Sequence, residues 1–189
     1  DAFILREDGS KAAPGETGIL HVRGPHVMLG YWKRPEQTAH MLRPGYWPGE
    51  RILCTQDLFR SDNDGYLYFA GRTDDVINSR GEKVSPVEVE RVLCGIDGVH
   101  QAAVLGMDDP ILGQAIHAFV EPDQTMDIDA AYLKAGCIQK LEAFMVPQTF
   151  EIVEQLPRTA NGKVDKRSLS AEQGQMTFTR EGSREGMTR

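Results

Sequence analysis

Short apolar runs separated by turn-forming residues dominate residues 1–72, a pattern that indicates β-strands. Gly18–Arg23 alternates between apolar and polar side chains, and the turn-forming residues 61–65 are predicted to join two further runs into a hairpin. Pro35 suits the start of a helix, because the first turn needs no backbone N–H from it. The expected strands are Ala2–Leu5, Gly18–Arg23, Ile52–Arg60 and Tyr66–Ala70, and the expected helix is Pro35–Leu42.

After Arg72 strands and helices follow each other. Ser85-Pro86-Val87-Glu88 has the form of a capping box with proline at the first helical position, which predicts a helix to about Cys94. The pattern as a whole predicts an α+β fold, with a β-rich region followed by a small α/β domain. The other expected elements are a hairpin around Ser79-Arg80-Gly81, strands at Val99–Gly106, Ala115–Glu121 and Phe150–Val153, and helices at Asp129–Phe144 and Lys166–Glu172.

Composition narrows the class of protein. The 189 residues are 40% hydrophobic and 26% charged, which is typical of a globular protein with a packed core. A net charge of −7 argues against a nucleic-acid-binding surface, because such a surface must replace the counterions of phosphates. No apolar run is long enough to span a membrane, and no signal peptide opens the sequence. The three cysteines form neither a disulfide framework nor a metal motif, and the scattered histidines suggest no zinc site, so we expect a reducing, cytoplasmic location.

The stretch LPRTANGKVDKR at 156–167 is a candidate site, because it places Lys163 behind Asn161-Gly162. A lysine on a glycine-hinged loop can reach a site built elsewhere and neutralise negative charge there. The alternative is structural, since Asn-Gly is a strong hairpin-turn signal and a lysine after it is usually a solvated surface residue.

Asp57 is a second candidate, because it interrupts an apolar strand run. Burying a carboxylate without hydrogen-bond donors is costly, so Asp57 either faces solvent or binds a polar ligand. A carboxylate can accept two hydroxyl hydrogen bonds, which is the geometry of a ribose diol, and Arg72 after the partner strand could come near it. Asp74 and Asp75 suit a polar linker.

Five segments together resemble the adenylate-forming superfamily, which contains acyl-CoA synthetases, nonribosomal adenylation domains and luciferases. They occur in the order and at the spacing of that family. The segments are GYWKRPEQT (30–38), TQDLFR (55–60), GRTDDVINSRGEKVSPVEVE (71–90), VLGMDDPILGQA (104–115) and LPRTANGKVDKR (156–167). The resemblance implies the last β-rich subdomain of a large N-terminal AMP-binding domain (1–72), a hinge (73–75) and a small C-terminal lid domain (76–172). We expect residues 173–189 to be disordered.

The resemblance also implies roles for individual residues. Asp57 matches the aspartate that binds the ribose hydroxyls of ATP, and Arg72 matches the arginine that contacts the same ribose. Phe69 matches an apolar position that lines the nucleotide. Lys83 matches a basic position that orients the nucleotide during adenylation.

Three further matches concern the two steps of the family's reaction. Lys163 matches the lysine that bridges the carboxylate substrate and the α-phosphate. Asp74 matches the hinge residue about which the small domain rotates, and Gly81 lies in the loop that lines the CoA tunnel. The resemblance gives no protein-bound metal site to these residues. ATP, Mg²⁺ and CoA are the implied substrates and cofactors.

Two departures qualify the resemblance. Gln56 stands where the family usually has glycine before the aspartate, and the glycine- and serine-rich phosphate loop is absent. We therefore expect an excerpt of a longer chain that depends on its missing N-terminal domain and is inactive in adenylation by itself. The form of residues 74–90 resembles the acyl-CoA synthetases, which favours an acid:CoA ligase. The acyl pocket of the family lies upstream of these residues, so a fatty or aryl acid is the default expectation. The alternatives are an adenylation domain that loads a carrier protein and a non-catalytic binding module.

Overall fold

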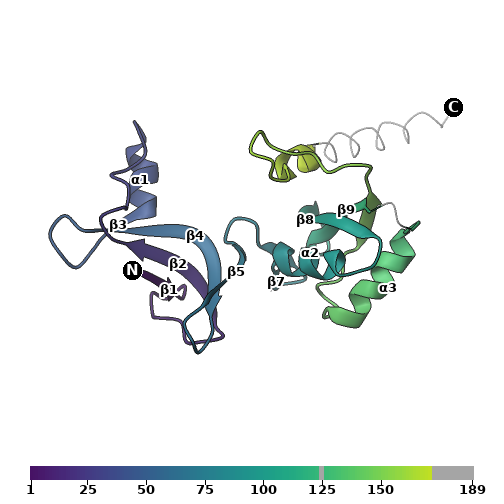
Figure 1. Ribbon diagram of the computed structural model, residues 1–189, viewed down its shortest axis with the longest axis horizontal. Coiled ribbons are helices and arrows are strands. Elements are labelled where there is room, and N and C mark those ends of the chain that lie inside the picture. The colour runs from purple at the N-terminus through teal and green to yellow at the C-terminus, as the bar shows by residue number, and fades with distance from the viewer. Residues whose placement is uncertain (124–125, 172–189) are drawn as a thin grey trace. The chain divides into compact units, whose positions relative to one another are not determined.

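In the computed structural model, which describes residues 1–123 and 126–171, the chain divides into two compact units (Figure 1). Unit 1 comprises Asp1–Asp75 and unit 2 comprises Val76–Arg189. The predicted α+β class is confirmed, because each unit contains its own five-stranded sheet and the longer helices lie in unit 2. The expected disorder at 173–189 lies outside the described residues.

Unit 1 is an antiparallel sheet organised around one long strand, β4. One edge of β4 pairs with β2, and the other edge is shared, with β3 along its first residues and β5 along its last. Strand β3 was not expected from the sequence, since it is only three residues long and ends at a proline. The elements are β1 Ala2–Leu5, β2 Thr17–Arg23, α1 Pro35–Met41, β3 Leu42–Pro44, β4 Arg51–Ser61 and β5 Leu67–Arg72.

Unit 2 is a mixed sheet with strand order β10-β9-β6-β7, in which β8 also pairs with β9. The β10–β9 pair is parallel, as expected for strands joined by a crossover that contains a helix, here α3. The elements are β6 Ile77–Ser79, β7 Glu82–Val84, α2 Pro86–Cys94, β8 Val99–Asp109, β9 Gly113–Pro122, α3 Ala130–Lys140 and β10 Thr149–Ile152, and residues 166–171 are helical.

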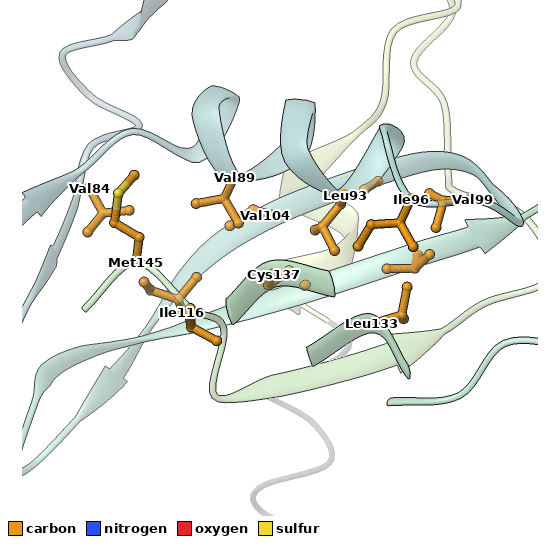
Figure 2. Close-up of a cluster of buried hydrophobic side chains, with 14 of the residues drawn as sticks. Val84, Val89, Leu93, Ile96, Val99, Val104, Ile116, Leu133, Cys137 and Met145 are labelled. Atoms are coloured by element: carbon orange, nitrogen blue, oxygen red, sulfur yellow. The ribbon is translucent and has the colours of Figure 1, made fainter. Parts of the chain in front are cut away.

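The sheet of unit 2 is buried on both faces. On one face, α2 and α3 contribute Leu93 and Leu133 to a core that includes Val104 and Ile116 of the sheet (Figure 2). On the other face, Phe119 packs with a smaller cluster formed by Ala103, Leu156 and Leu169. Successive residues of a strand point to opposite faces, so the almost continuous apolar run of β9 supplies both cores.

The sequence placed the helices correctly but not all of their ends. Ser85 is the N-cap of α2, yet its carbonyl rather than its side chain accepts the Glu88 N–H (3.2 Å), so the predicted reciprocal capping box is wrong. Helix α3 ends at Lys140 instead of Phe144, because Leu141 adopts extended backbone angles. Its N-cap is Asp129, whose carboxylate accepts the Tyr132 N–H at 2.7 Å.

The larger core of unit 2 should set the stability of that unit. We expect Leu93→Ala to lower its free energy of unfolding by about 2–5 kcal/mol, because Leu93 is fully buried and the cavity would be lined by packed neighbours. Urea unfolding followed by far-ultraviolet circular dichroism measures this, since α2 and α3 are the longest helices among the described residues.

The matched control is Ile138→Ala, which removes a side chain of α3 that is 60% exposed. Its expected cost is about 0.5 kcal/mol or less. Equal losses for the two variants would contradict the assignment of the core.

Candidate functional site

Three of the predicted site residues meet in unit 1, at the start of the β4–β5 pairing. The strand register places Asp57 opposite Arg72. One guanidinium nitrogen of Arg72 donates to Asp57 Oδ1 at 2.8 Å, and its Nε donates to Asp74 Oδ1 at 2.9 Å. The hydrogen bond to Asp74 raises the pKa of Arg72, and the charges of Asp57 and Asp75 act in the same direction. The planar guanidinium therefore orients both carboxylates.

The backbone of β4 fixes Asp57 through an irregularity in the sheet. Opposite Leu20 of β2, strand β4 carries three residues, Thr55, Gln56 and Asp57, instead of one. The Thr55 hydroxyl donates to the Leu20 carbonyl (2.9 Å) and accepts the Asp57 N–H (3.1 Å). The Gln56 carbonyl accepts the Thr73 N–H at 3.0 Å, which ties the irregularity to the end of β5. Such bulges re-aim side chains, here that of Asp57.

The Asp57 carboxylate keeps one oxygen available. Its side chain is 32% exposed, and among the described residues only Oδ1 accepts a hydrogen bond, from Arg72. A hydroxyl donor can therefore bind Oδ2 while Arg72 holds the group in place. The same geometry is compatible with a carboxylate that faces solvent.

Gln56 is the residue whose conformation the sequence did not reveal. Its φ is +60°, in the left-handed region that costs a side-chain-bearing residue about 1–2 kcal/mol. This explains physically why glycine suits the position. Gln56 Nε2 lies 3.1 Å from His40 Nε2 of α1, a contact that offsets part of the strain.

Phe69 lies on β5 but apart from the Asp57–Arg72 pair. Its ring makes an edge-to-face contact with Phe59 across the two strands, with ring centroids 5.6 Å apart. An irregularity of the ladder at Ala70 separates this contact from the pairing of Asp57 with Arg72. Phe69 is 44% exposed, so its ring offers an apolar surface to a ligand.

Gly81 and Lys83 lie on the β6–β7 hairpin of unit 2. Ser79 pairs with Glu82, so the loop contains only Arg80 and Gly81, both with positive φ (57° and 85°). This combination defines a two-residue turn whose twist matches the strands, and it requires a left-handed residue at the Gly81 position. The Arg80 N–H donates to the Leu112 carbonyl at 2.9 Å, which fixes the hairpin to the rest of unit 2. Lys83 is exposed on β7.

Lys163 lies at the end of a second hairpin, which we call the lysine hairpin (residues 158–164). Arg158 and Val164 form a β-bridge at its base. Within it, the Gly162 N–H donates to the Thr159 carbonyl (2.8 Å), and the Thr159 N–H donates to the Lys163 carbonyl (2.7 Å). Gly162 has φ +78°, so the loop is a three-residue turn closed by a left-handed glycine. The Asn-Gly hairpin signal is confirmed.

The ammonium group of Lys163 is available for binding. The residue is exposed, and its side chain forms no hydrogen bond or ion pair within residues 1–123 and 126–171. Its backbone is nevertheless held on both sides by the turn. An unpaired cation on an ordered hairpin is suited to binding an anion, because little further ordering of the backbone is needed.

Sequence reasoning missed Glu121. Its carboxylate accepts the Leu156 N–H at 2.8 Å and thereby holds the segment that precedes the lysine hairpin. The available signal was the one used for Asp57, a carboxylate in an apolar strand run, since Glu121 is only 9% exposed. Arg158 and its partner Gln101, which are 57 positions apart, carried no comparable signal.

Other chemistries find little support in the described part of the chain. Cys54 and Cys137 are buried, and burial raises the pKa of the Cys137 thiol to about 11, which suppresses the reactive thiolate. No group of three His, Cys, Asp or Glu side chains is placed to hold a metal ion among these residues. None of the described helices has the length and apolar character needed to cross a membrane.

Comparison with known proteins gives one family match. Residues 88–163, which include most of α2, then β8, β9, α3, β10 and Lys163, match the AMP-binding enzyme C-terminal domain. The chain is 40% identical over 167 residues to a 2-succinylbenzoate–CoA ligase of Geobacillus kaustophilus, covering 88% of the chain and 33% of the ligase. It is 39% identical to a feruloyl-CoA synthase of an Amycolatopsis species, covering 88% of the chain and 33% of that enzyme.

Among solved structures, ATP-bound MatB from Rhodopseudomonas palustris matches with a TM-score of 0.83 and 32% identity, over 91% of this chain and 33% of that protein. The chain therefore spans about a third of the length of the curated relatives that it matches.

The left-handed conformation of Gln56 leads to a stability prediction. Gln56→Gly should leave the free energy of unfolding of unit 1 within about 1 kcal/mol of its present value, because relief of strain offsets the lost His40 contact. Gln56→Val should lower it by about 1–2 kcal/mol, because a β-branched residue is poorly tolerated at positive φ. Both tryptophans, Trp32 and Trp47, lie in unit 1, so urea unfolding followed by tryptophan fluorescence reports on it.

Gln56→Asn is the matched control, since asparagine tolerates the left-handed region and should be close to neutral. A valine variant as stable as the glutamine protein would contradict the assigned conformation.

Proposed function

Since this chain belongs to the adenylate-forming enzymes, whose C-terminal domain it carries, we propose that the protein it is part of is an AMP-forming carboxylic acid:CoA ligase. In the first step, a carboxylate oxygen bonds to the α-phosphorus of ATP and the bond to the β-phosphate oxygen breaks, which releases pyrophosphate. In the second step, the CoA thiol loses its proton and attacks the acyl carbon, which forms the thioester and releases AMP.

The observation that carries the proposal is the unpaired Lys163 ammonium on its ordered hairpin. The attack of a carboxylate on a phosphate brings two anions together, and a positioned cation offsets their repulsion as charge develops in the transition state. Lysine acts as a point charge without a fixed direction, so catalysis depends on where the hairpin holds it.

The group formed by Asp57, Arg72 and Asp74 supports the nucleotide half of the proposal. Oδ2 of Asp57 accepts a ribose hydroxyl, Arg72 holds that carboxylate, and the exposed ring of Phe69 offers the nucleotide an apolar surface. Lys83 adds a positive charge on the β6–β7 hairpin. These assignments are part of the proposal and follow the family's motif positions.

The two steps make opposite demands on Lys163. Adenylation needs the ammonium at the phosphate, whereas thiol attack on the acyl-adenylate does not. A rotation about Asp74, at the end of unit 1, withdraws Lys163 and brings the Gly81 turn to the thiol. Hinges of this kind concentrate the change in backbone angles at a few residues, which is compatible with the position of Asp74 one residue before the unit boundary.

The acid is the part of the proposal that these residues define least. The two relatives named above are ligases of aromatic acids, so aryl acids are the first class to test, followed by fatty acids. The experiment uses the full-length protein with ATP, Mg²⁺, CoA and a panel of such acids. AMP and thioester are measured together.

Lys163→Ala should lower the adenylation rate by about 10²–10³-fold, because it removes the charge that stabilises the transition state. Thioester formation from a supplied acyl-adenylate should change little. The matched control is Lys11→Ala, which removes an exposed lysine of unit 1. CoA-dependent thioester formation with this response supports the proposal.

Two other outcomes would overturn it. Acyl-adenylate that accumulates without any use of free CoA would indicate an enzyme that loads a carrier protein. Absence of AMP with every acid would indicate a non-catalytic binding module.

A further inference from the structure

Two basic residues flank Lys163 and connect the lysine hairpin to distant parts of unit 2. Arg158 lies at the base of the hairpin, and Lys166 follows it at the start of the helical residues 166–171. Neither residue takes part in the proposed chemistry. Their contacts bear on how accurately the hairpin is held.

Lys166 fixes the segment after the hairpin. Its ammonium lies 2.7 Å from Glu90 Oε1 of α2 and donates to the Val104 carbonyl of β8 at 3.2 Å. The same Glu90 oxygen accepts the Val104 N–H at 2.8 Å, so helix, strand and hairpin segment share one network. The side chains of Lys166 and Glu90 are only 26% and 19% exposed, so salt screens this ion pair less than it would screen a surface pair.

The segment before the hairpin is fixed by burial. Leu156 is 1% exposed, packs in the core that contains Phe119, and donates its N–H to Glu121. The hairpin therefore leaves the sheet between two anchored points, Leu156 and Lys166. These anchors, with Val164 at the base of the hairpin, which packs against the core that contains Ala103 of β8, define where its ends lie.

Arg158 adds a polar contact that reaches the turn itself. One guanidinium nitrogen donates to the Gly162 carbonyl at 3.2 Å, next to Lys163, and the other donates to Gln101 Oε1 of β8 at 2.6 Å. Within the described part of the chain, the Arg158–Gln101 bond is the one side-chain hydrogen bond or ion pair that joins residues 158–163 to the sheet. The rigid fork of arginine reaches both acceptors at once, which the single ammonium of a lysine cannot reproduce.

We propose that Arg158 is a positioning residue for Lys163, acting by clamping the Gly162 carbonyl to Gln101 so that the lysine hairpin has one orientation against β8. The inference rests on the proposed function, because only adenylation requires Lys163 to be placed. The clamp should therefore matter for the first half-reaction and not for the second. A residue that merely stabilised unit 2 would affect both.

The test separates the effect of the forked geometry of Arg158 from the effect of its positive charge. In the full-length protein, Arg158→Lys keeps the positive charge but loses the fork, and Gln101→Met removes the acceptor at nearly constant size. Gln101→Glu keeps an acceptor oxygen and should therefore preserve the hydrogen bond from Arg158. Arg91→Lys, the same exchange at an exposed arginine of α2, is the matched control for Arg158→Lys. Each variant is assayed for acid-dependent ATP–pyrophosphate exchange and for thioester formation from supplied acyl-adenylate.

We expect Arg158→Lys and Gln101→Met each to lower the exchange rate about tenfold, because small misplacements of a catalytic group carry penalties of this size or more. The double variant should lose no more than either single variant, since both break the same contact. Gln101→Glu and Arg91→Lys should retain the exchange rate. Thioester formation should stay within about twofold for all variants, and the thermal midpoint should change little, because Arg158 is exposed.

Several results would overturn the inference. Equal losses in both half-reactions would make Arg158 a general stabilising residue. Unchanged exchange in Arg158→Lys and Gln101→Met, with exchange strongly reduced in Lys163→Ala, would reject the clamp and leave the proposed function intact. Unchanged exchange in Lys163→Ala would reject the role of Lys163 itself, and the clamp with it.

Discussion

The fold of unit 2 depends on strand β9, because side chains pack on both of its faces and other strands pair with both of its edges. Ile116, Ala118 and Val120 belong to the core beneath α2 and α3, whereas Phe119 belongs to the core on the opposite face. β8 pairs along one edge, while β10 and β6 pair with the other. A slip of one residue would exchange the two faces and disrupt both cores, so the register of β9 is strongly specified.

The position of Lys163 is a remote consequence of that register. Phe119 packs with Leu156 and Leu169, which bracket the lysine hairpin in the sequence. Glu121, two residues further along β9, accepts the Leu156 N–H. The position of the exposed lysine hairpin is therefore fixed by contacts of its flanking residues with the buried strand β9. This is the usual division between a rigid scaffold and a functional loop.

In unit 1, a candidate site residue is positioned by strand register and a local irregularity of the backbone. Asp57 and Arg72 come together through strand register, and three β4 residues opposite Leu20 turn Asp57 to its position. The strain of a left-handed Gln56 accompanies this arrangement. Irregular backbone of this kind is typical where a side chain has to be aimed, and it persists only where surrounding contacts support it. Here the Thr73 and Thr55 hydrogen bonds provide that support.

Periodicity predicted which segments form strands and helices, because burial imposes a local pattern on each of them. It could not predict the end of α3, which is decided by the backbone angles of Leu141, or that Ser85, the expected N-cap of α2, caps without a side-chain hydrogen bond. The Asp57–Arg72 pair was accessible from the sequence, since a carboxylate in an apolar strand needs a partner. Arg158 and Gln101 were not, because a contact across 57 positions leaves no local signature. The roles of all seven site residues, Asp57, Phe69, Arg72, Asp74, Gly81, Lys83 and Lys163, stay predictions.

The exposed placement of the lysine hairpin has an evolutionary consequence. Selection for folding removes variants whose stability falls below a threshold. Most of that stability comes from buried positions such as Phe119 and Leu93. Ala160, Asn161 and Lys163 bury little, so substitutions there scarcely change the abundance of the protein. A lineage can therefore lose or redirect the chemistry proposed for Lys163 while it keeps an intact fold.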